Sequence, residues 1–426
     1  MLNAISRYGA RVLPNTQQLI AAVKARGEFI QGPQIAEFER AFEKRLGSGR
    51  AISTAYGRMA FYYMLKALNL PPGSEIVVPA LTFWVVPALA QAAGLKVVFA
   101  DIDPDTFLLD PAAFERVVTD RTRVVVPTHL YGLPCEMDDI VSIAARHNLY
   151  VIEDCAHALG ALYRGRPVGT FGTGALFSFQ TLKPLNTYGG GMALVHDQAL
   201  AQRVANIVSA LPWPSEDRIR KRLFMGRVQR ILIRPNVFTW TSFPILWVAA
   251  LWDANPDVFL WEKIRPLHPL PQEYTERYSN VQAVLGLESL KYLDQWTAAT
   301  QANAQRLDQS LKDVLQVPTV PPDRTHVYYQ YCAYGADRDQ LIARCVRGGI
   351  DIESLHVDVC PELTDLFPGP HAETPGAARS EDAIQVPVYA SLTDAQIERI
   401  GRVVRQAAIE IARKAGVAPA DTAART

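Results

Sequence analysis

The chain has 426 residues, of which 49% are hydrophobic and 20% are charged, a balance typical of a well-packed globular protein and not of a disordered chain. Lysine plus arginine and aspartate plus glutamate both number 43, so the net charge favours neither nucleic acid nor acidic partners. We therefore expect no nucleic-acid partner, and the length predicts two domains or one large domain with an appendage.

The cysteines and the N-terminal residues indicate the compartment. The five cysteines are Cys135, Cys155, Cys332, Cys345 and Cys360. They are scattered and form no Cys-x-x-Cys pair, which favours a reducing compartment without disulfides or a metal site. The N-terminal stretch MLNAISRYGARVLPN lacks an apolar run followed by small residues, so we expect no secretion signal and a cytoplasmic protein.

Residues 1–210 are predicted to form an N-terminal arm and a large α/β domain. The piece QIAEFERAFEKRLG has the apolar spacing of an amphipathic helix, which Gly47 is predicted to end. Another helix is expected to start near Arg58. The expected strands are residues 76–80, 97–102, 123–132, 150–155, 175–180 and 190–196. Their alternation with helices predicts a mostly parallel sheet, whose ligands bind beyond the carboxyl ends of the strands.

Residues 211–270 interrupt this pattern and read as an insertion. Between residues 218 and 234 there are seven arginines and lysines and no acid, and the apolar run VFTWTSFPILWVAAL follows. That run is too short to span a bilayer. A basic helix followed by a Trp-rich apolar segment fits contact with a membrane surface through residues 218–261. A buried helix between subunits, with a solvated basic neighbour, fits the same pattern, and the sequence leaves both interpretations open.

Residues 271–412 are predicted to form a smaller C-terminal α+β domain. A long helix is expected from residue 280, a strand at 326–335, a helix at 337–350 and a last helix at 392–416, opened by Thr393 with a possible capping glutamine. Residues 413–426, small and polar, are expected to form a frayed tail.

The first candidate for chemistry is Lys183, in the stretch FSFQTLKPLNTYGGGMAL. It stands between an apolar run and three glycines at 189–191. A lysine held away from water in such a turn has a lowered amine pKa, as covalent chemistry on a carbonyl group requires. A lone loop lysine is usually solvated, so this interpretation depends on the partners of Lys183.

Asp154 is the expected partner, because it ends an apolar strand on the crevice side. Adjacent strand ends could place Asp154 and Lys183 in one pocket. Pyridoxal 5'-phosphate needs this pair, since the lysine binds it covalently and the acid keeps its pyridine nitrogen protonated. His157 could bond the cofactor's ring oxygen or act as an acid or base; a turn residue and a satisfied core histidine are the ordinary alternatives for Asp154 and His157.

The phosphate of such a cofactor needs free amides at a helix start. Gly57, Arg58 and Met59 open the helix after the first strand, and Arg58 could add charge-assisted bonds. Ser178 could contribute a hydroxyl, and Phe83, after the second strand, could stack on the pyridine face.

Taken together, these landmarks resemble the DegT/DnrJ-type sugar aminotransferases, pyridoxal-phosphate enzymes with the aspartate-aminotransferase fold (fold type I). The matching stretches are FIQGPQIAEFERAF, VVPALTFW, FADIDPDTF, THLYGLPCEMDDI, VIEDCAHALGA, FSFQTLKPLNTYGGGMAL, YSNVQAVLGLESL and VPVYASLTDAQIERI. The resemblance covers roughly residues 28–200 and 272–405. It implies a large, mostly parallel-sheet domain, a smaller C-terminal α+β domain and a homodimer in which a partner segment reaches the phosphate.

The resemblance also assigns residues. It implies that Lys183 is the Schiff-base lysine, Asp154 the acid at the pyridine nitrogen, and His157 the Gln/His position beside the ring. It further implies a phosphate-binding role for Ser178 and a stacking role for Phe83.

Four positions depart from the family pattern. Gln180 stands where the family often has His. Arg58 stands where the family has Thr or Ser at the phosphate helix. Gly189 replaces a family glutamate near the substrate, and Thr275 stands where the family's partner-subunit asparagine contacts the phosphate.

The function implied is transfer of an amino group from an amino acid, usually glutamate, to a ketone acceptor, most often a nucleotide-linked keto-sugar. A lipid-linked or amphiphilic acceptor at a membrane surface is one alternative. A non-catalytic sensor or scaffold that keeps the cofactor pocket is the alternative from another class.

Overall fold

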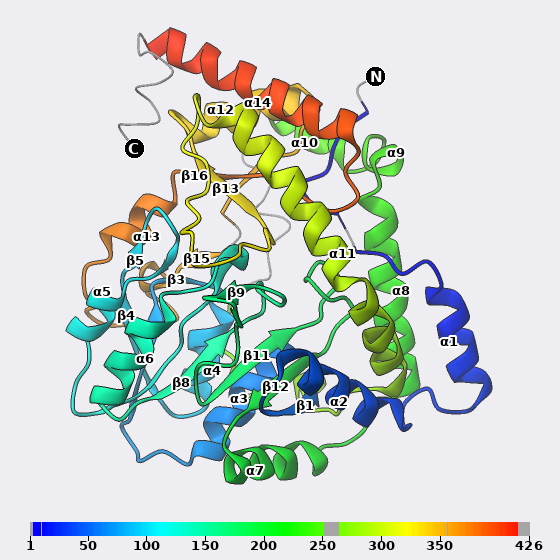
Figure 1. Ribbon diagram of the computed structural model, residues 1–426, viewed down its shortest axis with the longest axis vertical. Coiled ribbons are helices and arrows are strands. Elements are labelled where there is room, and N and C mark those ends of the chain that lie inside the picture. The colour runs from blue at the N-terminus through cyan, green and yellow to red at the C-terminus, as the bar shows by residue number, and fades with distance from the viewer. Residues whose placement is uncertain (1–2, 10, 251–263, 356, 416–426) are drawn as a thin grey trace.

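The structure is a computed structural model that describes residues 3–9, 11–250, 264–355 and 357–415. A seven-stranded sheet, ordered β1-β12-β11-β8-β7-β2-β4, forms its centre (Figure 1). The strands are β1 (Arg50–Thr54), β2 (Glu75–Pro79), β4 (Lys96–Ala100), β7 (Thr122–Val125), β8 (Tyr150–Asp154), β11 (Gly174–Ser178) and β12 (Gly191–Val195). Strands β11, β8, β7, β2 and β4 run parallel, and β12 is antiparallel to both of its neighbours. The predicted, mostly parallel α/β sheet is confirmed.

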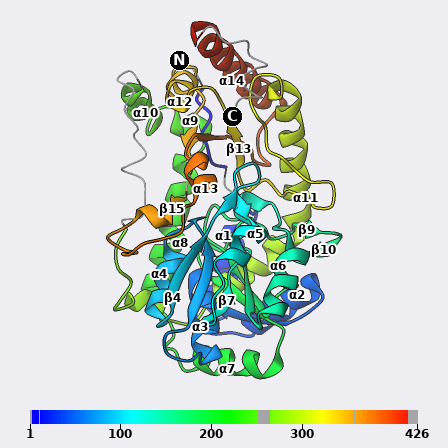
Figure 2. The ribbon, with the colours of Figure 1, turned by 90° about the vertical axis from the view of Figure 1, so that its left-hand side faces the viewer.

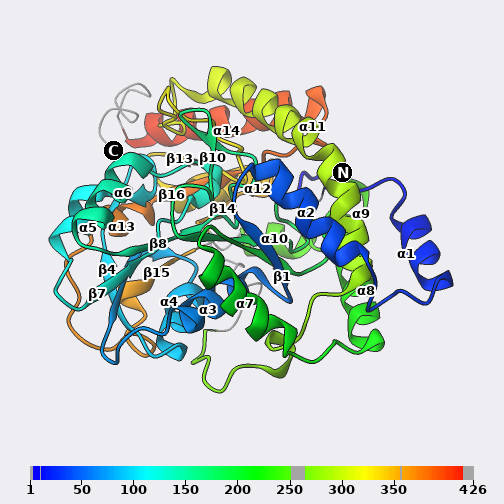
Figure 3. The ribbon, with the colours of Figure 1, turned by 60° about the horizontal axis from the view of Figure 1, so that its bottom comes forward.

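Residues that alternate along the strands face different helices on the two sides of the sheet. Phe177 packs against Phe42 of α2 (Gln34–Leu46), whereas Leu176 lies in the core shared with α3 (Gly57–Leu68). Helix α2 ends at Gly47, whose φ of 77° is left-handed, as expected for a glycine stop. Figure 3 shows α2 and α7 on opposite sides of β1. The other helices of this part are α1 (Thr16–Ala25), α4 (Val85–Ala92), α5 (Pro111–Arg116), α6 (Met137–Arg146) and α7 (Gln198–Ser209).

The structure also contains short strands, most of them in pairs outside the seven-stranded sheet, and short 3-10 helices. These elements are β3 (Leu81–Thr82), β5 (Ile102–Asp103), β6 (Leu108–Leu109), β9 (Leu162–Tyr163), β10 (Arg166–Pro167), β15 (Asp358–Val359), η1 (Leu130–Gly132), η3 (Gln272–Tyr274) and η4 (Cys360–Glu362). Because β15 pairs with β3, which follows β2 of the large sheet, a segment of the C-terminal part is hydrogen-bonded to the N-terminal part.

The C-terminal part has its own sheet and its own core. Strands β13 (Tyr331–Tyr334), β16 (Ala383–Val386) and β14 (Glu353–Ser354) form the sheet, and α12 (Arg338–Arg347) and α14 (Asp394–Ala415) share its core. Helix α13 (Pro375–Ser380) packs instead near β5 and Asp101. The 32-residue α11 (Asn280–Leu311) packs on α2 at one end and on α14 at the other. Thr393 and Gln396 bond to each other's backbone amides, which confirms the predicted cap. Helix α14 continues through Ala415, past the expected start of the tail; residues 416–426 lie outside the described residues.

Two predicted strands are shorter than expected, for one shared reason. The expected strand at 123–132 ends at Val125, and the expected strand at 326–335 begins only at Tyr331. Between these limits the two segments bond to each other, because the amides of Val327 and Gln330 donate to the carbonyls of Gly132 and Tyr131. Residues 326–330 therefore fold over the large sheet instead of extending the small one.

The predicted insertion is largely helical where it is described. It contains α8 (Glu216–Leu232), α9 (Pro235–Phe238) and α10 (Phe243–Ala249), and Figure 2 shows α10 on the rim of the molecule opposite α11. Residues 251–263, which belong to the expected membrane-contact stretch, lie outside the described residues. None of the helices in the described parts of the chain has the length and apolar character needed to cross a bilayer.

Candidate active site

The candidate site lies at the carboxyl ends of β8 and β11, which are adjacent and parallel. Asp154, the last residue of β8, is in register with Leu176 of β11, two residues before Ser178. The chain leaves β11 there and forms the turn that holds Lys183, whose amide donates to the carbonyl of Gln180 at 3.0 Å. The expected meeting of Asp154 and Lys183 at neighbouring strand ends is therefore present, and their charges interact.

Strand alternation separates the two neighbouring acids Glu153 and Asp154. Both carboxyls are buried. Glu153 accepts hydrogen bonds from the amides of Gly169, Phe171 and Gly172, and lies 3.1 Å from the His129 ring nitrogen. Asp154 points to the other face of the strand and accepts a hydrogen bond from the backbone amide of Ala156 at 3.0 Å. Burial raises the pKa of Asp154, and this bond and the Lys183 charge oppose the rise.

The environment of Lys183 favours the neutral amine. Burial lowers the pKa of Lys183 to about 7; the Asp154 charge opposes this change, and the Arg58 charge reinforces it. The amine lies 4.5 Å from the centre of the Tyr329 ring. A cavity of about 30 Å3, lined in part by Leu182, Pro184 and Tyr329, adjoins the same turn.

Tyr329 is a site residue that the sequence did not reveal. Its ring stacks on the His157 ring, with centroids 4.1 Å apart, so it lies between His157 and the Lys183 amine. The signal was hidden because residues 326–335 read as one strand, in which a tyrosine is an ordinary core or surface residue.

His157 is fixed in one orientation. Its Nδ1 accepts a hydrogen bond from the Tyr131 amide at 3.3 Å, and its ring stacks on Tyr329 and Tyr131. In the neutral imidazole, this bond places the ring proton on Nε2. The Tyr329 ring therefore links His157 to the Lys183 amine, and the donor nitrogen of His157 is defined by its backbone partner.

At the start of α3, the backbone at Gly57 lies very close to neighbouring residues. A Cβ at Gly57 would lie 2.7 Å from the Phe177 carbonyl and 2.9 Å from the Ser178 Cβ. A Cβ at Gly191 would lie 2.2 Å from the Gly57 Cα. Tyr56, the N-cap of α3, makes no capping bond with its side chain. The start of α3 thus packs closely against Ser178, and the N-terminus of a helix is the kind of place that binds a phosphate.

Met59, also predicted to contact the cofactor, lies deeper than Gly57 and Arg58. Its amide donates to the Tyr56 carbonyl at 3.0 Å, and its side chain is completely buried in the main core. Its described contacts are those of a packing residue.

An aromatic cluster surrounds Arg58. The guanidinium lies 5.4 Å from the Phe83 ring centre and 5.3 Å from that of Tyr274, and it donates to the Tyr274 hydroxyl at 2.5 Å. Thr275, the residue predicted to contact a phosphate across a dimer, donates from its own hydroxyl to the Gln272 carbonyl at 3.0 Å. Within the chain, Tyr274 and not Thr275 therefore reaches Arg58, a contact that the sequence did not reveal.

Helix α8 supplies a second guanidinium to this cluster. Arg222 donates to the Tyr56 hydroxyl at 2.6 Å and lies over the Tyr56 ring, 4.6 Å from its centre. A Cβ at Gly189, whose φ is 122°, would lie 2.9 Å from the Arg222 Cδ. A side chain at position 189 would therefore crowd Arg222, so a positive group lies here, where the family pattern has a carboxylate.

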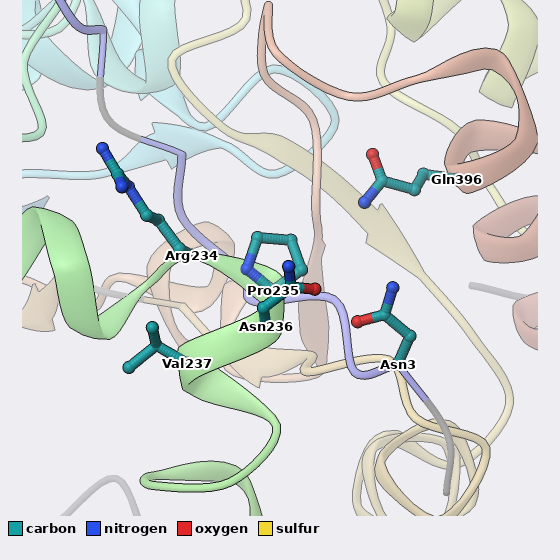
Figure 4. A pocket seen from close by; sticks show the side chains of 6 residues that line it. All are labelled: Asn3, Arg234, Pro235, Asn236, Val237 and Gln396. Carbon is teal, nitrogen blue, oxygen red and sulfur yellow. The ribbon is translucent and has the colours of Figure 1, made fainter.

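Two other features of the described residues carry no chemistry for this site. His129, Glu153 and Cys155 lie close enough to hold a metal ion, but the hydrogen bonds of Glu153 and the bond from the Cys135 amide to His129 already use the ligand atoms of Glu153 and His129. A cavity of about 480 Å3 between α9 and α14 is shown in Figure 4 with Asn3, Asn236 and Gln396 around it. Its lining residues include no acid and no lysine.

Comparison with known proteins gives a consistent result. Residues 13–218 and 262–405 match the model of the DegT/DnrJ/EryC1/StrS aminotransferase family, and residues 219–261 fall between the matched segments. The chain is 31% identical over 384 residues to a GDP-perosamine synthase of Caulobacter vibrioides, covering 87% of this chain and 88% of that protein.

Solved structures agree with this result. The chain superposes on the aminotransferase TlmJ of Streptoalloteichus hindustanus with a TM-score of 0.77 and 23% identity, covering 96% of this chain and 99% of that one. It superposes on S. venezuelae DesV in complex with a ketimine intermediate with a TM-score of 0.72 and 26% identity, covering 92% and 94% of the two chains.

Proposed function

The chain belongs to the DegT/DnrJ/EryC1/StrS aminotransferase family, and from this premise we propose that it is a pyridoxal-5'-phosphate-dependent enzyme that transfers the amino group of glutamate to a nucleotide-linked keto-sugar. The observation that carries the proposal is the charge interaction of the buried Asp154 carboxyl with the Lys183 amine beyond the end of the neighbouring strand. Burial brings the lysine pKa to about 7, and the acid lies at the adjacent strand end.

The residues present fit the cofactor. Gly57 leaves backbone room beside Ser178 for a phosphate at the start of α3. The hydroxyls of Thr128 and Tyr131 are buried with no hydrogen-bond partner among the described residues, and Thr128 pairs by its backbone with Asp154. Buried hydroxyls without partners are costly unless a polar ligand satisfies them. These features support a polar ligand seated between α3 and β8.

Each residue then has a stated task. When bound, the cofactor supplies an electron sink that stabilises negative charge on the carbon bearing the transferred amine. Lys183 would hold the cofactor covalently and, once released, its neutral amine would take the proton from that carbon. Asp154 would hold the proton on the pyridine nitrogen, while His157, as a donor from Nε2, and Phe83, as an aromatic neighbour, would help to bind and orient the ring.

Charge at the mouth of the pocket supports an anionic acceptor. Arg58 and Arg222 both lie within cation–π distance of the Tyr56 ring, at the same helix start. Guanidinium groups bind phosphates through paired, charge-assisted bonds. One relative is named for a GDP-linked sugar, which supports the nucleotide-linked class. A diphosphate on a lipid carrier presents the same anion. An assay of the acceptor should therefore compare nucleotide-linked and lipid-linked keto-sugars.

The first test is the visible absorption spectrum of the purified holoprotein before and after adding glutamate. We expect a yellow band that glutamate bleaches, and Lys183→Ala is expected to abolish both the bleaching and any cofactor fixed by borohydride. Asp154→Asn is expected to keep part of the cofactor and to slow the bleaching by orders of magnitude, with Asp120→Asn, an exposed acid, as the control. A protein that binds the cofactor but is not bleached by any amino acid would support the scaffold alternative and contradict the proposal.

A further inference from the structure

Exposed apolar side chains are concentrated in one short segment. Of the eleven large hydrophobic residues that are exposed in the described chain, eight lie between Phe224 and Val248. The exposed fractions are 62% for Phe224, 64% for Trp240 and 70% for Ile245. Isolated exposed apolar residues are ordinary, but a cluster of this kind marks an interaction surface.

The exposure on α8 does not come from a loosely placed helix, because the opposite face is anchored. Arg218 pairs with Glu276, Arg222 bonds to Tyr56, and Arg230 bonds to the Tyr188 hydroxyl. Gly226, between them on the same face, lies against the Tyr188 ring. These positions recur every four residues, so they define the inner face of α8.

The outer face of α8 combines apolar and basic residues. Phe224, Met225, Ile231 and Leu232 are exposed there. Arg220, Lys221 and Arg227 are exposed beside them, and Arg234 follows the helix. Helix α8 opens with the acids Glu216 and Asp217, and Arg220 pairs with Glu216. From residue 218 to residue 250 the sequence has no further acid. This part of the surface is therefore both apolar and strongly positive.

Helix α10 repeats the two-faced arrangement. Phe243 and Leu246 are buried in a small core with Ala343 and Val346 of α12. Ile245, Trp247 and Val248 are exposed on the other side. Tryptophan side chains, with an apolar body and one polar N–H, are enriched where apolar and aqueous layers meet.

Charge decides between the possible occupants of this surface. A second copy of the chain, joined by a two-fold axis, would bring the same cations against one another. Anionic lipid headgroups have the complementary charge, and the acyl layer beneath them accepts the apolar side chains. No described helix can span a bilayer, so contact would be limited to the interface.

We propose that the outer faces of α8 and α10, with Trp240 between them, dock the enzyme on an anionic lipid surface. The described residues that carry this surface lie within the stretch 219–261 that the family model leaves unmatched, so the property goes beyond the aminotransferase function. It does not depend on which acceptor the enzyme uses.

The test is cosedimentation of the full-length holoprotein with vesicles of phosphatidylcholine alone or mixed with phosphatidylserine. We expect binding to the mixed vesicles that weakens as salt is raised. The triple variant R220Q/K221Q/R227Q is expected to bind on the order of 100-fold more weakly, since each cation near such a surface contributes about fivefold. The matched control is K44Q/K312Q/R402Q, which removes three exposed cations elsewhere and is expected to bind as the unchanged protein does.

A second pair of variants tests the apolar component without altering charge. Trp240→Ser and Ile245→Ser are expected to release the protein from the mixed vesicles, while the visible spectrum and the glutamate reaction report an intact enzyme. Equal binding by the two triple variants, or no binding of folded holoprotein to mixed vesicles, would overturn the proposal. A second copy of the chain would be identified as the occupant by two results together. The protein without substitutions would not bind vesicles, and Trp240→Ser would convert its dimer to a species of lower mass.

Discussion

In the protein freed of cofactor, the amine of Lys183 is expected to titrate near pH 7. Removing the negative charge of Asp154 and removing the positive charge of Arg58 are expected to shift the pKa of this amine in opposite directions. Asp154→Asn removes a negative charge that raises the lysine pKa, so the pKa should fall further. Arg58→Gln removes a positive charge that lowers the lysine pKa, so the pKa should rise. Each shift should be about one unit, the usual size for a charge that is close by.

The magnitude follows from the change in pKa from 10.5 to about 7. At pH 7, an amine with the ordinary value is about 0.03% neutral, whereas Lys183 should be roughly half neutral. The reactive form is thus enriched by more than a thousandfold. The shift corresponds to roughly 5 kcal/mol between the charged and neutral forms, an upper value because the lysine side chain keeps some contact with solvent.

The assay is the initial rate at which trinitrobenzenesulfonate modifies Lys183, followed by peptide mass spectrometry as pH is varied. A lysine model peptide in the same buffers supplies the reference curve. A midpoint near that of the peptide would show that burial does not set the state of the amine. Shifts of the same sign in Asp154→Asn and Arg58→Gln would refute the charge arrangement even if the midpoint were near 7.

Three further perturbations test other parts of the site. Tyr329→Ala, which removes the ring between His157 and Lys183, should slow bleaching by glutamate by about tenfold or more, and Tyr329→Phe should restore most of the rate; equal rates for the two variants would contradict a role for the stacked ring. Arg222→Gln should weaken inhibition of the glutamate reaction by guanosine diphosphate by about tenfold, with Lys221→Gln as the control, and unchanged inhibition would remove Arg222 from anion recognition. Burial would raise the pKa of Glu153, but its bonds from His129 and the backbone amides prevail and lower it; the stability it contributes is therefore present above about pH 4.5 and is lost as pH falls below that value. Glu153→Gln should reduce the free energy of unfolding at pH 7 by about 3 kcal/mol and flatten its fall in acid, while Glu37→Gln, an exposed change, should do neither in denaturant titrations.

The sequence predicted what depends on local pattern. The positions of β8 and β11, and hence the approach of Asp154 to Lys183, follow from two short apolar runs and the geometry of adjacent parallel strands. Gly47 and Thr393 mark helix ends because glycine accepts a left-handed φ and threonine caps an exposed amide.

The sequence could not predict contacts made by segments that fold back from far away. Tyr329 reaches the site only because residues 326–330 bond to the turn at 131–132, and Tyr328 adopts a φ of 48° there. Arg222 reaches it from a helix whose basic residues looked alike in sequence, and the structure divides them into an anchored inner set and an exposed outer set. Such divisions depend on tertiary packing, which no single window of sequence contains.

The close approach of Gly57 and Gly191 limits how this site can evolve. A side chain at either position would meet backbone atoms, at 2.7 Å from the Phe177 carbonyl for Gly57 and 2.2 Å from the Gly57 Cα for Gly191. A compensating second substitution can shrink a neighbouring side chain, but it cannot remove a carbonyl or a Cα. No stepwise mutational path therefore leads away from this pair, and new substrates must be acquired through positions such as 58, where the neighbours are side chains.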